Sequence, residues 1–118
     1  DSYAPNGGYG GTNTDLLMGS HLAIPKWMTA DGLGIQTEVG RKLFYTMQNY
    51  GAYIVDDSAW EAYNFCAEYG VAEEVLETYN IGIKKGMLYS QTDANIISAS
   101  NAFAGDMRLI MTNLCIVK

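Results

Sequence analysis

The sequence predicts a small, mainly helical α+β domain with a short β-sheet. Apolar residues recur at helical spacing over residues 37–50, which indicates an amphipathic helix. Short apolar runs indicate strands near residues 16–24, 52–56 and 115–117. The chain has 118 residues, of which 48% are apolar, so it can bury one hydrophobic core.

The chain begins with a segment rich in Gly and Tyr, residues 1–15, which we expect to form an extended arm. Four Gly residues lie between positions 7 and 11, and this content disfavours a stable helix. The single α+β domain is then expected over residues 16–118. It begins with the strand at 16–24, which Pro25 ends, and residues 26–34 have the composition of a turn region.

The clearest helix is predicted between Thr37 and Tyr50. Thr37 can cap its N-terminus, and Glu38 suits the positive end of the helix dipole. Gly51 supplies the stop, and the strand at 52–56 follows directly. The apolar stripe of this helix consists of Val39, Leu43, Phe44, Met47 and Tyr50.

Three further helices are predicted in the second half of the chain. A capping box at 58–61 starts a helix that runs to about Tyr69. A short helix is expected at 71–79, with three Glu side chains facing solvent, and a final helix at 102–113. Residues 81–101 give only weak signals. The positions expected to face the core are Val71, Ala72, Val75, Leu76, Tyr79, Phe103, Met107, Ile110, Met111 and Leu114.

The charge balance excludes some classes of function. Seven Lys and Arg residues stand against 13 Asp and Glu residues, a formal net charge of -6. Scattered cations on an acidic chain lack the electrostatic footprint of a nucleic-acid-binding protein. No run of residues approaches the ~18 apolar residues of a membrane span. We therefore expect neither a nucleic acid partner nor a membrane span.

Three polar residues are candidates for a catalytic role, and each has a structural alternative. His21, the single His, can serve as a general base or can bond a neighbour, and we favour the structural role. Asp56 and Asp57 follow a predicted strand. One of them can contribute to glycosidic bond cleavage, which needs two carboxyl groups ~5–10 Å apart, or can cap the next helix.

Aromatic side chains are candidates for sugar binding. Two Trp and nine Tyr residues supply enough aromatic surface to stack on sugar rings. We expect most Tyr side chains to pack in the interior, and Trp60 fits the core equally well. The region of Tyr3, Tyr9 and Trp27 is expected to be more open. The candidate ligand-binding residues are Tyr3, Tyr9, Trp27, Tyr53 and Trp60.

The sequence predicts no metal and no cofactor. Two Cys residues and one His are too few for a structural zinc site. The Gly cluster lacks the Lys-Ser/Thr of a P-loop. Cys66 and Cys115 can form one disulfide in an exported protein, which would stabilise the fold by about 4 kcal/mol on the chain-entropy model. They can equally remain two buried free thiols.

The run GLGIQTEVGRKLFYTMQNYGAYIVDD, residues 32–57, resembles a segment of a group of large, mostly uncharacterised secreted bacterial proteins. These proteins occur in polysaccharide-degrading organisms, and YGAYIVDD is the most specific part of the shared pattern. The resemblance continues in parts of residues 1–25 and 58–80 and in residues 106–117, whereas 81–101 match nothing in it. It carries over no catalytic residue.

The resemblance implies that the chain is the C-terminal region of a longer, β-rich polypeptide and that it lies outside the cytoplasm, in the periplasm or the extracellular space. Upstream strands would then be missing from residues 1–118. The chain would then be a cleaved part of a longer protein or a subunit whose sheet another protein chain completes. An apolar patch is expected beside the strand at 16–24 or beside the N-terminal arm.

The leading hypothesis for function is an extracellular carbohydrate-associated domain, which binds polysaccharide or assists a polysaccharide-active enzyme. The alternative is a structural subunit of an extracellular filament or assembly, a homo-oligomer that uses the arm at 1–15 for subunit contact. A further alternative is a carboxylate-dependent polysaccharide hydrolase or lyase. The expected partner is accordingly a polysaccharide or a completing protein chain.

Overall fold

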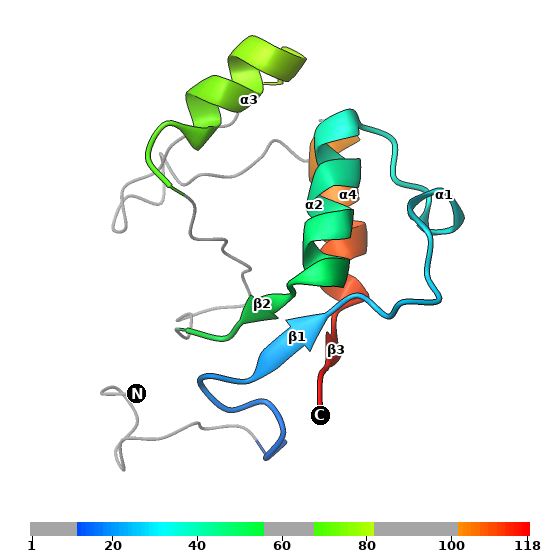
Figure 1. The fold of residues 1–118 in the computed structure, drawn as a ribbon, viewed down its shortest axis with the longest axis vertical. Coiled ribbons are helices and arrows are strands. Elements are labelled where there is room, and N and C mark those ends of the chain that lie inside the picture. The colour runs from blue at the N-terminus through cyan, green and yellow to red at the C-terminus, as the bar shows by residue number, and fades with distance from the viewer. Residues whose placement is uncertain (1–11, 56–67, 82–101) are drawn as a thin grey trace.

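The computed structural model describes residues 12–55, 68–81 and 102–118. Within these ranges, four helices accompany one three-stranded antiparallel sheet, which confirms the small α+β domain. The elements in chain order are β1 (His21–Ala23), α1 (Ala30–Leu33), α2 (Glu38–Asn49), β2 (Ala52–Tyr53), α3 (Val71–Tyr79), α4 (Ala102–Thr112) and β3 (Cys115–Ile116) (Figure 1).

The sheet has the strand order β2-β1-β3, so β1 is central. His21 of β1 pairs with Tyr53 of β2, and Ala23 of β1 pairs with Cys115 of β3. β1 begins later than the predicted strand at 16–24 because a turn precedes it. In this turn Ser20 N donates to the Leu17 carbonyl oxygen (2.9 Å), and the intervening Gly19 has a left-handed φ of 87°.

The predicted helix over residues 37–50 is confirmed as α2. Thr37 is its N-cap, and its hydroxyl oxygen accepts a hydrogen bond from Gly40 N at 3.0 Å. The helix ends at Asn49, and Gly51 follows the cap with a φ of 72°. The predicted capping residue and the predicted stop are therefore both present.

α1 corrects the prediction of a turn region over residues 26–34. Thr29 caps this single helical turn by accepting a hydrogen bond from Gly32 N at 3.0 Å. Gly34 ends it with a φ of 84°. Four residues are too few to show a helical period, so the sequence pattern resembles that of a turn.

α3 and α4 lie close to their predicted positions, whereas three expectations about side chains and a helix end are wrong. Leu76 on α3 is half exposed, although it was expected to face the core. The helix predicted to begin at 58 lies outside the described residues up to position 67, and its predicted end at about Tyr69 is wrong, because Glu68 and Tyr69 are not helical. Tyr69, Tyr50, Tyr53 and Tyr45 are exposed, which contradicts the expected packing of most Tyr side chains for these four.

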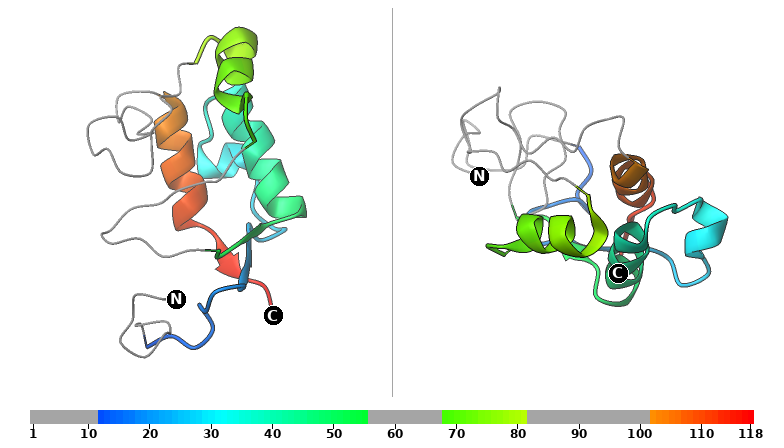
Figure 2. Two further views of the ribbon diagram at one scale, coloured as in Figure 1. Left: turned by 90° about the vertical axis from the view of Figure 1, so that its left-hand side faces the viewer. Right: turned by 90° about the horizontal axis from the view of Figure 1, so that it is seen from above.

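The core lies between the sheet and two helices. α2 and α4 run side by side in the same direction, and each leads into an outer strand of the sheet (Figures 1 and 2). α1 and α3 lie on opposite sides of α2. The buried core cluster consists of Ile24, Ala30, Ile35, Phe44, Met47 and Ile110. Among the described helices, none is long and apolar enough to cross a membrane.

Candidate functional site

The sheet has one face toward the core and one outer face. Side chains alternate along a strand, and Ala52 packs against the core cluster, so its partner Leu22 lies on the same side. His21 and Tyr53 therefore lie on the outer face, and so does Cys115, which pairs with Ala23. The register thus places two predicted site residues, His21 and Tyr53, directly opposite each other.

A groove of about 430 Å³ lies beside this outer face. β1 and the segment after it form one wall, the end of α2 forms another, and β3 closes the third side. None of the described lining residues is acidic. The lining consists of His21, Lys26, Gln48, Asn49, Tyr50 and Cys115, together with the apolar residues Ala23, Ile24, Pro25, Ile116 and Val117.

The His21 ring is fixed by a hydrogen bond to the backbone at the end of α2. Its Nε2 lies 2.8 Å from the carbonyl oxygen of Tyr50. Because a carbonyl oxygen only accepts, Nε2 carries the proton, and Nδ1 is the acceptor in the neutral ring. This is the structural bond predicted for His21. Nδ1 accepts no hydrogen bond from the described residues, so it is the atom that would act as a base.

The Tyr53 ring stacks on the His21 ring. The ring centroids of His21 and Tyr53 are 4.7 Å apart, and the rings are inclined by 17°. Ile54 N donates to the Ser20 carbonyl oxygen (3.1 Å), so His21–Tyr53 is a non-hydrogen-bonded pair, in which side chains approach most closely. Tyr53 is nevertheless 62% exposed. Its ring therefore has one supported face and one face open to solvent.

Lys26 stands at the rim of the groove. Its Nζ donates to Asn49 Oδ1 at 2.8 Å. The segment that carries Lys26 is attached to α2 by Gln48, whose Nε2 donates to the carbonyl oxygens of Pro25 (2.9 Å) and Met28 (3.0 Å). These hydrogen bonds hold the Lys26 backbone beside the end of α2.

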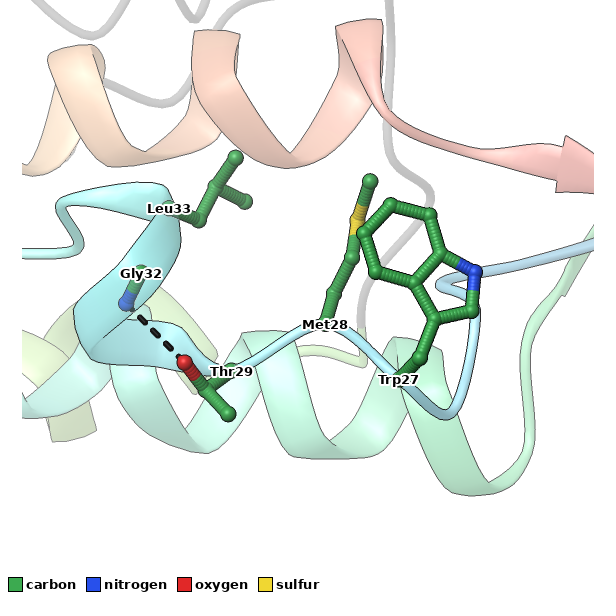
Figure 3. A pocket seen from close by; sticks show the side chains of 5 residues that line it. All are labelled: Trp27, Met28, Thr29, Gly32 and Leu33. Atoms are coloured by element: carbon green, nitrogen blue, oxygen red, sulfur yellow. Dashed lines mark hydrogen bonds between the residues drawn. The ribbon is translucent and has the colours of Figure 1, made fainter.

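Trp27 lies outside this groove and borders a smaller pocket of about 210 Å³. Its side chain is 78% exposed, which agrees with the prediction of an open region. Figure 3 shows the indole beside Met28, with Leu33 of α1 across the pocket. Thr29 and Gly32 complete the described lining, in which no residue is charged.

Several predicted site residues lie outside the described residues. These are Tyr3, Tyr9, Asp56, Asp57, Trp60 and Cys66. The carboxylate site at Asp56 and Asp57 therefore stays a prediction, and so does the disulfide. The Cys115 side chain is exposed, so the alternative of a buried thiol is wrong for this residue. In the described parts of the chain, no group of three or more His, Cys, Asp or Glu could hold a metal ion.

Asp106 is a buried polar residue that the sequence pattern did not single out. Its side chain is only 1% exposed, and its carboxylate faces the N-terminus of α2. Its burial could have been predicted from helical spacing. Asp106 falls three residues after Phe103 and four before Ile110, and this places it on the apolar face of α4. Its contacts are intramolecular, so we assign it to the fold and not to the groove.

Comparison with protein-family models, with curated proteins and with solved structures found no match to this chain. The functional argument therefore rests on the groove and on the His21–Tyr53 stack.

Proposed function

We propose that the outer face of the sheet binds carbohydrate and that the chain is a carbohydrate-associated domain of a secreted protein. The observation that carries this proposal is the stacked pair of His21 and Tyr53. The C–H face of a sugar ring packs on an aromatic ring, and binding costs less entropy when that ring is already held in place. Tyr53 offers such a ring, with one face supported and the other exposed.

The groove beside the stack supplies the polar groups that a sugar requires. Its volume of about 430 Å³ falls within the ~300–1,000 Å³ that is usual for ligand sites. Lys26 and the Asn49 amide offer N–H donors, and the Tyr50 hydroxyl both donates and accepts. Sugar hydroxyls need both kinds of partner, and the groove offers both. Tyr53 itself does not line the groove, so a sugar unit in the groove would be a neighbour of the unit stacked on Tyr53.

Retention on insoluble polysaccharides, followed by titration calorimetry with the soluble forms, tests this proposal. We expect the wild-type chain to bind, Tyr53→Ala to weaken binding at least about tenfold, and Tyr53→Phe to retain it because the ring remains. Tyr69→Ala is the matched control, because Tyr69 is fully exposed and lies just before α3, outside the sheet that carries the stack. A wild-type chain that is retained by none of a broad set of polysaccharides would contradict the proposal.

A second candidate function is that of a structural subunit in an extracellular assembly. Exposed apolar side chains gather at the end of the sheet where β1 begins and the outer strands end. The residues are Leu17, Met18, Val55 and Val117. Leu17 and Met18 belong to the 16–24 segment, beside which the sequence predicts an apolar patch. Among the described residues, β2 and β3 have no partner on their outer edges, and such edges favour strand addition.

Multi-angle light scattering over a concentration series tests this second function. An assembling chain should give a mass above that of one copy, and Val55→Lys or Val117→Lys should return it to a monomer. Leu76→Lys is the control, because Leu76 is equally apolar and half exposed but lies on α3. A wild-type chain that stays monomeric at high concentration would exclude the assembly function.

A further inference from the structure

We infer that the groove selects sugars that carry an anionic group, a uronate carboxylate or a sulfate ester, and that Lys26 recognises this group. The inference rests on the proposed carbohydrate-binding function and specifies its ligand class. Its basis is the contrast between an acidic chain and a groove that has no acidic lining residue among those described.

Lys26 differs in its partners from three other described cations, Arg41, Lys42 and Lys118. Arg41 pairs with Asp31, and Lys118 lies 2.7 Å from the carboxylate of Asp15. Lys42 lies near two Glu side chains on α2 and α3. The partner of Lys26 is the neutral amide oxygen of Asn49, and no described carboxylate pairs with it. The positive charge of Lys26 is therefore not neutralised by the described residues.

The donors at the rim of the groove suit an anionic acceptor. The Lys26 ammonium group has three N–H donors, and the hydrogen bond to Asn49 uses one of them. Asn49 accepts through Oδ1, which leaves its amide N–H groups for a ligand. A carboxylate or sulfate at this position would form charge-assisted hydrogen bonds, which are about twice as strong as neutral ones.

The net charge of the chain does not prevent this recognition. A charge of -6 repels a polyanion at long range, but the Debye length is only about 8 Å at physiological ionic strength. Within the groove, the nearest charged groups therefore decide the preference. The positive charge of Lys26 should therefore change the relative affinities for charged and neutral sugars and should not raise the association rate constant.

The test uses pairs of polymers that share a backbone and differ in charge. Calorimetry compares polygalacturonate with fully methyl-esterified homogalacturonan, and a sulfated galactan with its desulfated form, for the full chain. We expect at least one charged polymer to bind about tenfold more tightly than its neutral partner. Lys26→Gln should abolish this preference, and Lys26→Arg should preserve it. Arg108→Gln removes the same charge from the exposed surface of α4 and should leave the preference unchanged.

The outcomes separate this inference from the proposed function. A preference for polygalacturonate identifies the carboxylate as the recognised group, and a preference for the sulfated galactan identifies the sulfate. Equal affinity for charged and neutral polymers, or a preference that survives Lys26→Gln in a folded variant, overturns the inference and leaves carbohydrate binding intact. If neither these four polymers nor the broad polysaccharide set binds, the proposed function fails as well.

Discussion

A single buried carboxylate joins the two core helices. Asp106 Oδ1 accepts a hydrogen bond from Gln36 N (2.8 Å), and Oδ2 accepts from Thr37 N (2.8 Å) and from the Thr37 hydroxyl (2.6 Å). These donors lie at the start of α2, where the helix dipole favours negative charge. Gly40 makes the approach feasible, because a Cβ at this position would overlap the Asp106 carboxylate. The position of α4 thus depends on an anion supplied by its own second turn.

We predict that Asp106→Asn lowers the free energy of unfolding by about 2–4 kcal/mol. An amide has one acceptor oxygen, so its NH₂ group would face donors that the carboxylate now satisfies. Urea denaturation measures the change. Asp31→Asn is the control, because Asp31 makes only an exposed ion pair with Arg41, whose loss should cost about 0–1 kcal/mol. Equal effects of the two substitutions would contradict the role assigned to Asp106.

Gly51 determines the position of the His21 ring. Its φ of 72° favours Gly, and a Cβ at this position would also overlap His21 Nε2 and the Leu22 carbonyl oxygen. We predict that Gly51→Ala destabilises the chain by about 1–3 kcal/mol more than Gly70→Ala. Gly70 has a comparable φ of 91° but open space around it, so the difference isolates the overlap.

Nuclear magnetic resonance of the His21 and Tyr53 rings provides the second measurement for Gly51→Ala. Displacement of His21 should remove the ring-current shifts that the stack produces, whereas Gly70→Ala should leave them unchanged. Unchanged shifts in Gly51→Ala would show that the ring tolerates a Cβ at this position.

At the level of elements, the sequence predicts the helices that depend on residues close together in the chain. Helical spacing and the Thr37 cap predicted α2, and the same spacing predicted α3 and α4. The groove could not be predicted, because its walls come from residues 21–26, 48–50 and 115–117, which only the tertiary fold brings together. His21 and Tyr53 were both candidates, but their contact depends on a strand register that no local pattern specifies.

A polar contact between α3 and α2 should depend on pH. Lys42 Nζ donates to the Tyr79 hydroxyl and lies 5.1 Å from the ring centroid. This hydrogen bond, with the nearby charges of Tyr79, Glu38 and Glu74, raises the pKa of Lys42 above its usual 10.5. Because the pKa is higher in the folded chain, the contact stabilises fully below 10.5 and is lost as pH rises through the raised value.

A double-mutant cycle with Lys42→Met and Tyr79→Phe measures this contact. We predict a favourable coupling free energy that is constant near neutral pH and disappears in alkaline solution above the folded pKa. The cycle cancels the titration of other Tyr and Lys side chains, since they are present in all four proteins. A coupling that is zero at neutral pH, or that persists well above the folded pKa of Lys42, would contradict the contact.

Across the whole molecule, segments far apart in the sequence share one core. α2 leads into β2 and α4 leads into β3, and these two strands flank β1 on opposite sides. Phe44 of α2 and Ile110 of α4 are both completely buried in the same cluster. The groove is lined by residues of β1 and β3 and by the end of α2, which precedes β2. Its shape therefore depends on how the last 17 residues pack against the first part of the chain.

We therefore predict that Ile110→Ala lowers the free energy of unfolding by about 2–5 kcal/mol, because Ile110 is buried where α4 packs against the core cluster. Leu76→Ala should cost about 0.5 kcal/mol or less, because half of the Leu76 side chain already faces water. Urea denaturation, followed by circular dichroism and by Trp fluorescence, measures both changes. Since one core joins the described segments, the two probes should give the same midpoint for Ile110→Ala. Midpoints that separate would mean that α4 and β3 unfold independently of the rest of the core.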